Sequence, residues 1–208
     1  LTDGTFIEGD AVIVATGGFS YQSTGSTGDG YRFARELGLK ATDIAPSLVP
    51  LKTKEDYVPK LQGLSLKNTG LTIKNGKKVL YEDFGEMMFT HFGVTGPMIL
   101  SVSAHIGAKL AKAPNGELSA YLDLKPALTR EQLDARILRE FEAGPNKQFK
   151  NVIGVLFPSS LTPVMLELGG IPAEKKIHDI SREERQHFID LIKAFPFTIT
   201  GMGEFKEA

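Results

Sequence analysis

The feature that most constrains this chain is the stretch of residues 11–37, AVIVATGGFSYQSTGSTGDGYRFAREL. Residues 11–15 (AVIVA) form a short apolar run rich in β-branched side chains, which predicts a strand buried on both faces. Gly17 and Gly18 follow, and glycines allow positive φ angles and the close approach of another group. A second glycine cluster then opens a helix predicted over residues 30–37. The order of strand, glycine turn and helix predicts a small α/β unit.

The two glycine clusters have two interpretations. Either both are only turns, because glycine is among the commonest turn residues, or they form one edge of a ligand site. A helix that starts after glycines presents free N–H groups and the positive end of its dipole, which suits an anion. The clusters lie close together, and the first directly follows the predicted strand, which favours the ligand-binding edge.

The rest of the chain divides into a strand-rich part and a helix-rich part. Residues 46–125 and 195–208 are rich in predicted strands, and residues 126–194 are rich in predicted helices. Asn75-Gly76 is a strong signal for a two-residue hairpin turn. The expected fold class is therefore α+β, with a β-rich, barrel-like domain that a helical domain interrupts.

Local signals place several further elements. Residues 5–8 and 85–90 are predicted strands, and Pro97 is expected at the first position of a helix. Two capping boxes predict the starts of helices in the interrupting domain. They are formed by Thr129 with Gln132 and by Ser181 with Glu184.

Composition excludes some classes of function. The net charge is −1 over 208 residues, which gives no reason to expect a nucleic acid or an anionic membrane as partner. There are no cysteines, so disulfides and thiol catalysis are excluded, and a cytoplasmic location is expected. No apolar run approaches the ~20 residues that span a bilayer.

His91 is the one candidate catalytic residue that the sequence offers. It lies in THFGVTGP, a loop with glycines between a predicted strand and the helix at Pro97, and an imidazole there could act as a general acid or base. The alternative is that His91 only fixes the loop by hydrogen bonds. No metal site is expected, because the four histidines do not have the spacing of metal ligands.

The glycine clusters resemble the second flavin-contacting segment of two-dinucleotide-binding-domain flavoproteins. Three further blocks, LQGLSLKN (residues 61–68), GEMMFTHFGVTGP (85–97) and FPFTITG (195–201), follow in order. The chain is similar to a bacterial family of NAD(P)/FAD-dependent oxidoreductases, which includes aminoacetone oxidase-like and bile-acid 3-dehydro-reductase-like flavoproteins. The resemblance implies a flavin-dependent oxidoreductase that transfers hydride between NAD(P)H, FAD and a small organic substrate.

The resemblance also implies an organisation and a cofactor site. Residues 1–45 would be the remnant of an FAD-binding α/β domain whose GxGxxG unit does not occur in this sequence, so the chain alone is expected to be inactive and without FAD. The cofactor-binding residues carried over by the motifs are Ala15, Thr16, Gly17, Gly18, Thr27, Gly28, Asp29 and Gly30. Asp29 would repel a phosphate, so it is expected either to cap the helix or to hold a ribose hydroxyl or a flavin amide.

One alternative function stays open at this point. The chain contains no complete active site, so it could be a β-rich binding or interaction module with a helical insert and no redox role. A flavin in the longer protein would distinguish the two hypotheses.

Overall fold

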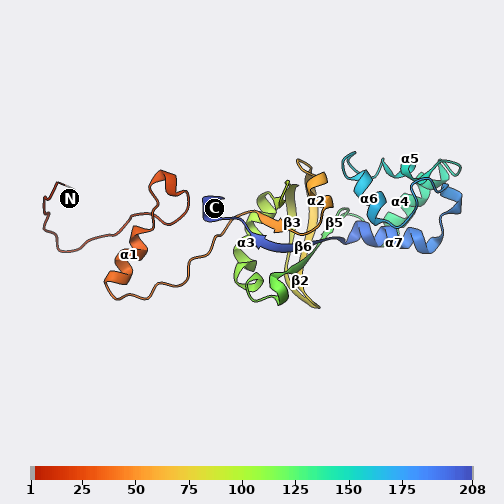
Figure 1. Ribbon diagram of the computed structural model, residues 1–208. Coiled ribbons are helices and arrows are strands. Elements are labelled where there is room, and N and C mark those ends of the chain that lie inside the picture. The colour runs from red at the N-terminus through yellow and green to blue at the C-terminus, as the bar shows by residue number, and fades with distance from the viewer. Residues whose placement is uncertain (1–2, 208) are drawn as a thin grey trace.

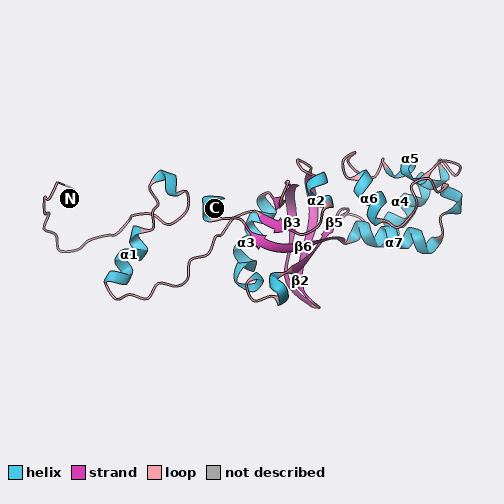
Figure 2. Ribbon diagram, viewed as in Figure 1, coloured by secondary structure: helices cyan, strands magenta, loops and turns pink. Residues whose placement is uncertain are grey.

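The structure, a computed structural model, describes residues 3–207. It has three parts in a row: an N-terminal segment (residues 3–50), a closed β-barrel, and a helical unit (residues 130–193) (Figure 1). The barrel lies between the other two, as the colouring by secondary structure makes clear (Figure 2). This arrangement confirms the expected α+β class.

The barrel is formed by six strands of residues 3–207, and all neighbours are antiparallel. The strands are β1 (Leu51–Thr53), β2 (Ser65–Asn75), β3 (Lys78–Phe89), β4 (Gly93–Thr95), β5 (Leu118–Asp123) and β6 (Phe195–Met202). They follow the order β1-β4-β3-β2-β5-β6 and close on each other, so each strand has a paired neighbour on both sides. Alternate residues of β5 are buried, as the two-residue period of a strand requires.

The hairpin between β2 and β3 forms where the sequence predicts it. Asn75 pairs with Lys78, so the two turn residues are Gly76 and Lys77, one position later than expected. Gly76 has a φ of +57°, which favours glycine at this position. Residues 85–89 are in a strand as predicted, but this strand is the continuation of β3 rather than a separate one, because β2 pairs with β3 on both sides of a register shift.

Two helices pack on the barrel. These are α2 (Tyr57–Lys60) and α3 (Pro97–Leu110), and Pro97 occupies the predicted first position. The buried face of α3 repeats at helical spacing and consists of Met98, Ile99, Val102, Ser103, Ile106 and Leu110. It covers the barrel beside β3, as Figure 1 shows, and closes one side of the core.

The helical unit lies between β5 and β6 in the sequence. Its helices are α4 (Arg130–Glu142), α5 (Phe149–Ile153), α6 (Thr162–Leu168) and α7 (Arg182–Lys193). Both predicted capping boxes form, at the starts of α4 and α7. Its core contains the rings of Phe149 and Phe188, which meet edge to face at 5.2 Å between centroids. No helix of the described residues is long and apolar enough to cross a bilayer.

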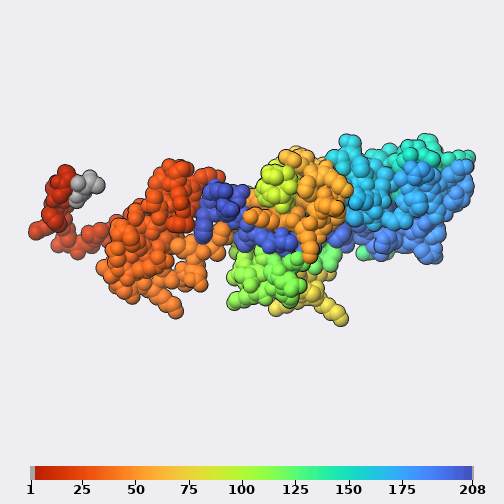
Figure 3. Space-filling view, in the orientation of Figure 1, coloured from red at the N-terminus to blue at the C-terminus, as the bar shows by residue number. Residues whose placement is uncertain are grey.

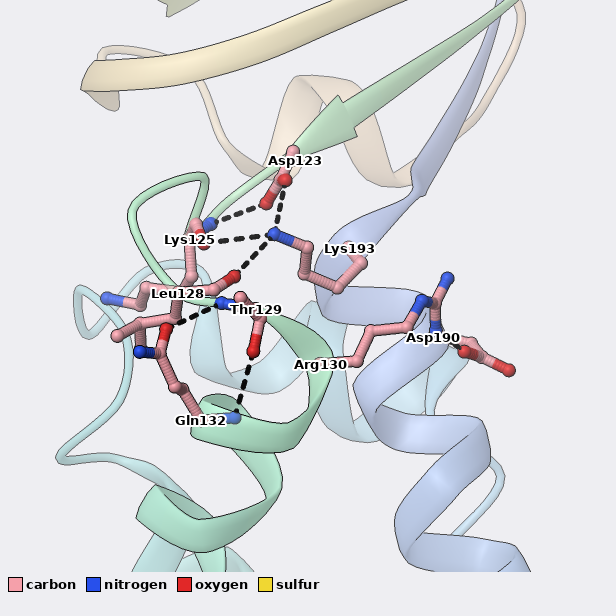
Figure 4. Close-up of polar contacts among 8 residues, drawn as sticks. All are labelled: Asp123, Lys125, Leu128, Thr129, Arg130, Gln132, Asp190 and Lys193. Atoms are coloured by element: carbon pink, nitrogen blue, oxygen red, sulfur yellow. Dashed lines mark hydrogen bonds and ion pairs between the residues drawn. The ribbon is translucent and has the colours of Figure 1, made fainter.

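The helical unit is joined to the barrel by polar contacts at the ends of β5 and α7. The Leu124 N–H donates to the carbonyl of Ile192, with a nitrogen–oxygen distance of 3.0 Å. Asp123 and Lys193 form an ion pair beside it (Figure 4). In the space-filling view the helical unit lies directly against the barrel (Figure 3).

The N-terminal segment differs from the prediction. Neither residues 5–8 nor residues 11–15 form a strand, and Val12 and Ile13 are 86% and 90% exposed. A strand becomes buried only when neighbouring strands pair with it and other elements cover its faces, and no other described residues do so here. The segment does form α1 (Asp29–Glu36), one residue from the predicted start.

Gly38 follows the end of α1. It has a φ of +74°, its N–H donates to the carbonyl of Arg35, and the N–H of Leu39 donates to that of Ala34. This is the pair of bonds of a Schellman motif. Single 3-10 turns lie at Gln22–Thr24, Pro114–Gly116, Ile177–Asp179 and Phe205–Glu207.

Candidate cofactor site

The two glycine clusters pack against each other in what we call the glycine-turn unit, residues 16–36. A Cβ built on Gly28 would lie 2.6 Å from the ring carbon Cδ2 of Phe19. A Cβ on Gly30 would lie 3.0 Å from the Oγ1 of Thr16. The distance at Gly28 is too short for a side chain, and the distance at Gly30 would require Thr16 to shift. These glycines therefore allow the first cluster to approach the start of α1 closely. The predicted cofactor residues of the two clusters therefore do come together.

Gly18 is different from its neighbours. It is exposed, its φ is not in the left-handed region, and a Cβ built on it would have no heavy atom of another residue within 4 Å. Packing within the described chain does not require glycine at this position. Ala15, which lies just before the first glycine cluster, is also exposed.

Asp29 is the first residue of α1, and the N-cap is Gly28, so the prediction of Asp29 as N-cap is wrong. The reason is that its carboxylate is held by other groups. The Thr27 hydroxyl donates to Asp29 Oδ2 at 3.0 Å, and Arg32 reaches Oδ1 at 3.2 Å. The Thr27 hydrogen bond, followed by the guanidinium of Arg32, lowers the pKa of Asp29 below its ordinary value.

The start of α1 has free donors. The backbone N–H groups of Asp29 and Gly30 make no hydrogen bond to any other group of residues 3–207. Unpaired donors are the rule in the first turn of a helix, and a ligand can satisfy them. The side chain of Thr27 is already used by Asp29, so the contacts that this turn offers come chiefly from its backbone.

Two hollows flank the glycine-turn unit and share Phe19. One is lined by Thr27, Gly28 and Asp29 together with side chains of α1, and the other by Pro46 and residues 203–206. Phe19 and Phe205 meet edge to face, with 5.2 Å between centroids. The end of the chain beyond β6 thus contacts the first glycine cluster. Sequence reasoning missed both aromatic residues, although the position of Phe19 directly after a glycine pair was a usable signal.

His91 lies apart from these hollows. Its side chain is exposed in the loop between β3 and β4, and its ring meets that of Phe92 edge to face at 4.9 Å. Thr90 holds this loop, because its Oγ1 accepts hydrogen bonds from the N–H groups of Phe92 and Gly93. Neither hollow at the glycine-turn unit is lined by His91. Residues 3–207 contain no cluster of three or more side chains that could hold a metal ion.

Three curated proteins are among those to which the chain is similar. A 3-dehydro-bile acid delta(4,6)-reductase of Clostridium scindens is 29% identical over 206 residues, which cover 99% of this chain and 50% of the reductase. A ribosomal RNA dihydrouridine synthase of Haemophilus influenzae is 28% identical over 199 residues, or 95% of this chain and 45% of that protein. The Escherichia coli protein of the same name is 28% identical over 166 residues, or 78% and 38%.

The chain spans about half the length, or less, of the curated relatives it matches. A family model described as the HI0933-like protein barrel and H2TH domain matches residues 45–208, which hold the whole barrel and the helical unit. The chain therefore belongs to the HI0933-like family and is related to a reductase.

Proposed function

We propose that this chain is part of a flavin-dependent oxidoreductase that transfers hydride between NAD(P)H, FAD and an organic substrate. The observation that carries the proposal is the glycine-turn unit, where two glycine clusters meet at the start of α1 and leave backbone donors free. The family relation supports it, because one relative is named a reductase. The others are named for dihydrouridine, which differs from uridine by two added hydrogen atoms.

The residues present fit a flavin dinucleotide in two ways. Gly18 is a glycine that the chain's own packing does not require, which is what a site of close contact with a ligand needs. The free N–H groups of Asp29 and Gly30 can donate to carbonyl oxygens of a flavin ring. Bound FAD would supply the hydride chemistry, and the protein would supply binding and orientation.

The parts of the chain have distinct roles in this proposal. Ala15, Thr16, Gly17 and Gly18 pass beside the dinucleotide, and Thr27, Gly28, Asp29 and Gly30 approach it through the first turn of α1. The barrel and the helical unit select the substrate. His91 is the candidate proton donor or acceptor from its exposed loop.

The names of the relatives offer two classes of substrate, a bile acid and ribosomal RNA. The same fold can serve different substrates, so the fold does not show which of the two this chain acts on. Only the residues of a binding site can distinguish them. Both names imply the same kind of chemistry, reduction, so we propose the reaction class ahead of the substrate.

The experiment is the absorbance spectrum of the longer protein that contains this chain, purified without added cofactor. We expect the two flavin bands, and we expect NADH or NADPH to bleach them in the absence of oxygen. A colourless, inactive longer protein would contradict the proposal and favour the binding-module alternative. The 208-residue chain alone is expected to bind added FAD weakly, and tight binding would show that it holds more of the site than proposed.

A further inference from the structure

Two adjoining hollows lie where the barrel meets the helical unit, and Leu128 lines both. The first, of about 590 Å³, is lined by Lys67, Phe84 and Lys125 among others. The second, of about 570 Å³, continues along α4 past Arg136 and Arg139. We call the two hollows together the junction groove.

A β-bulge aims side chains into the junction groove. Leu66 pairs with Met87, and Thr69 pairs with Gly85, so two residues of β2 lie opposite a single residue of β3. These two are Lys67 and Asn68, and Asn68 has a φ of +54°. Bulges commonly redirect side chains beside functional sites, and both of these residues line the groove. The bulge is held by the Thr69 hydroxyl, which donates to the carbonyl of Gly85 at 3.2 Å.

The cations of the groove are not neutralised. Within residues 3–207, no carboxylate lies within ion-pair distance of Lys67, Lys125 or Arg139. Arg136 has only an exposed pair with Glu140 on its own helix, at 3.6 Å, and such pairs are weak.

Lys125 is the most constrained of these cations. Burial, and after it the charge of Arg136, lowers the pKa of Lys125 below its ordinary value. The nearby carboxylate of Asp123 is used by Lys193, and the Lys125 side chain points away from that pair (Figure 4). An anion bound in the groove would compensate this charge.

An exposed aromatic ring lies beside the cations. Phe84 points outward from β3 and lines the groove, and it is 59% exposed, so its ring is open to a ligand. We propose that the junction groove binds single-stranded RNA, with backbone phosphates against Lys67, Lys125, Arg136 and Arg139 and one base stacked on Phe84. Cations that follow the backbone and an aromatic platform for a base are the two elements of single-strand binding.

The spacing of the cations favours RNA over a small acid. They extend from the bulge of β2 to the face of α4, where Arg136 and Arg139 lie three residues apart. A bile acid carries one carboxylate and would use one of them, whereas successive phosphates use all four. The side-chain amides of Asn68 and Gln132 also line the groove and can contact a ribose 2′-hydroxyl. The net charge of −1 does not oppose this, because the groove concentrates positive charge locally.

The test measures fluorescence anisotropy of a labelled single-stranded RNA oligomer with the 208-residue chain, without flavin. We expect binding that weakens from about 50 to about 200 mM salt. Lys67→Ala and Arg139→Ala should each reduce the slope of log K against log salt by about 0.7. Phe84→Ala should weaken binding by about 5- to 150-fold. Lys77→Ala, in the hairpin turn outside the groove, is the matched control and should leave binding unchanged.

The outcomes separate the proposal from its alternatives. Groove variants that bind like Lys77→Ala, or no binding at low salt, would overturn it. Equal competition by polyglutamate would indicate a general polyanion surface, and competition by cholate at equal concentration would indicate a small acid; either contradicts the proposal. A DNA oligomer of the same sequence should bind more weakly, and equal binding would contradict the assignment of RNA. Because no flavin is present, the result does not depend on the proposed redox function.

Discussion

Lys193 at the end of α7 reaches Asp123 at the end of β5, with 2.5 Å between Nζ and Oδ2. The same ammonium donates to the backbone carbonyls of Lys125 at 3.2 Å and Leu128 at 2.8 Å. The side chains of Lys193 and Asp123 are only 14% and 25% exposed. One cation thus ties the last residue of a barrel strand, the loop that follows it and the last helix of the helical unit (Figure 4).

Lys193→Met should weaken this junction. The substitution leaves the Asp123 carboxylate half-buried without its cation and removes the donor from two carbonyls, so we expect a loss of about 2 kcal/mol in the free energy of unfolding. The measurement is urea denaturation followed by circular dichroism. Lys112→Met, at an exposed lysine after α3, is the control. Equal midpoints for the two variants would show that the ion pair contributes nothing to stability.

Gly93→Ala should disrupt the barrel. A Cβ on Gly93 would lie 2.0 Å from the backbone oxygen of Leu51, which precedes its β1 partner Lys52. Backbone atoms of a closed barrel cannot move away cheaply, so we expect destabilisation of about 3 kcal/mol or more. Thermal unfolding measures this. Gly154→Ala, where a Cβ meets no atom within 4 Å, should unfold at about the wild-type temperature. An unchanged melting temperature for Gly93→Ala would contradict the β1–β4 pairing.

Glu184 should make the helical unit sensitive to acid. The Lys175 ammonium, and then the N–H of Ser181, lowers the pKa of Glu184 below its ordinary value of 4.5. A carboxylate whose folded pKa is lowered stabilises the fold above its unfolded pKa, and this contribution is lost as the pH falls through the folded pKa. Urea midpoints should therefore drop below about pH 4.5, and the drop should be smaller in Glu184→Gln than in Glu142→Gln. The same drop in both variants would exclude Glu184 as a cause.

His91→Gln tests the proposed proton-transfer role in the longer protein. We expect NAD(P)H to reduce the flavin at the wild-type rate, while reduction of the substrate slows by about 100-fold. Stopped-flow absorbance separates the two half-reactions. His91 is exposed, so its replacement should leave the unfolding temperature unchanged. If the variant carries out both half-reactions at the wild-type rates, His91 has no role in the proposed mechanism.

The sequence predicts those elements whose signals are local. The capping boxes at Thr129 and Ser181 and the helix start at Pro97 form as expected, because each depends on neighbours within a few residues. The closure of the barrel and the pairing of Asp123 with Lys193 depend on residues far apart in the chain, and no local pattern specifies them.

The candidate site shows the same limit. The sequence indicates that the glycines permit close approach, and in the structure Gly28 and Gly30 lie against Phe19 and Thr16 with little room for a Cβ. The sequence does not show that Phe19 contacts Gly28 or Phe205. The prediction of a buried strand at residues 11–15 is wrong, since such a strand requires neighbouring strands that local composition does not supply.

The flavin content of Gly18→Val and Gly154→Val, each in the longer protein, tests the assignment of the glycine-turn unit most directly. Both glycines are exposed, neither has a φ in the left-handed region, and a Cβ on either meets no other residue within 4 Å. Both variants should therefore fold like the wild type. We expect Gly18→Val to be purified with at least about tenfold less bound flavin, because its side chain would occupy the path of the dinucleotide, while Gly154→Val keeps full occupancy. Equal flavin content in the two variants would contradict the assignment of the glycine-turn unit to the cofactor.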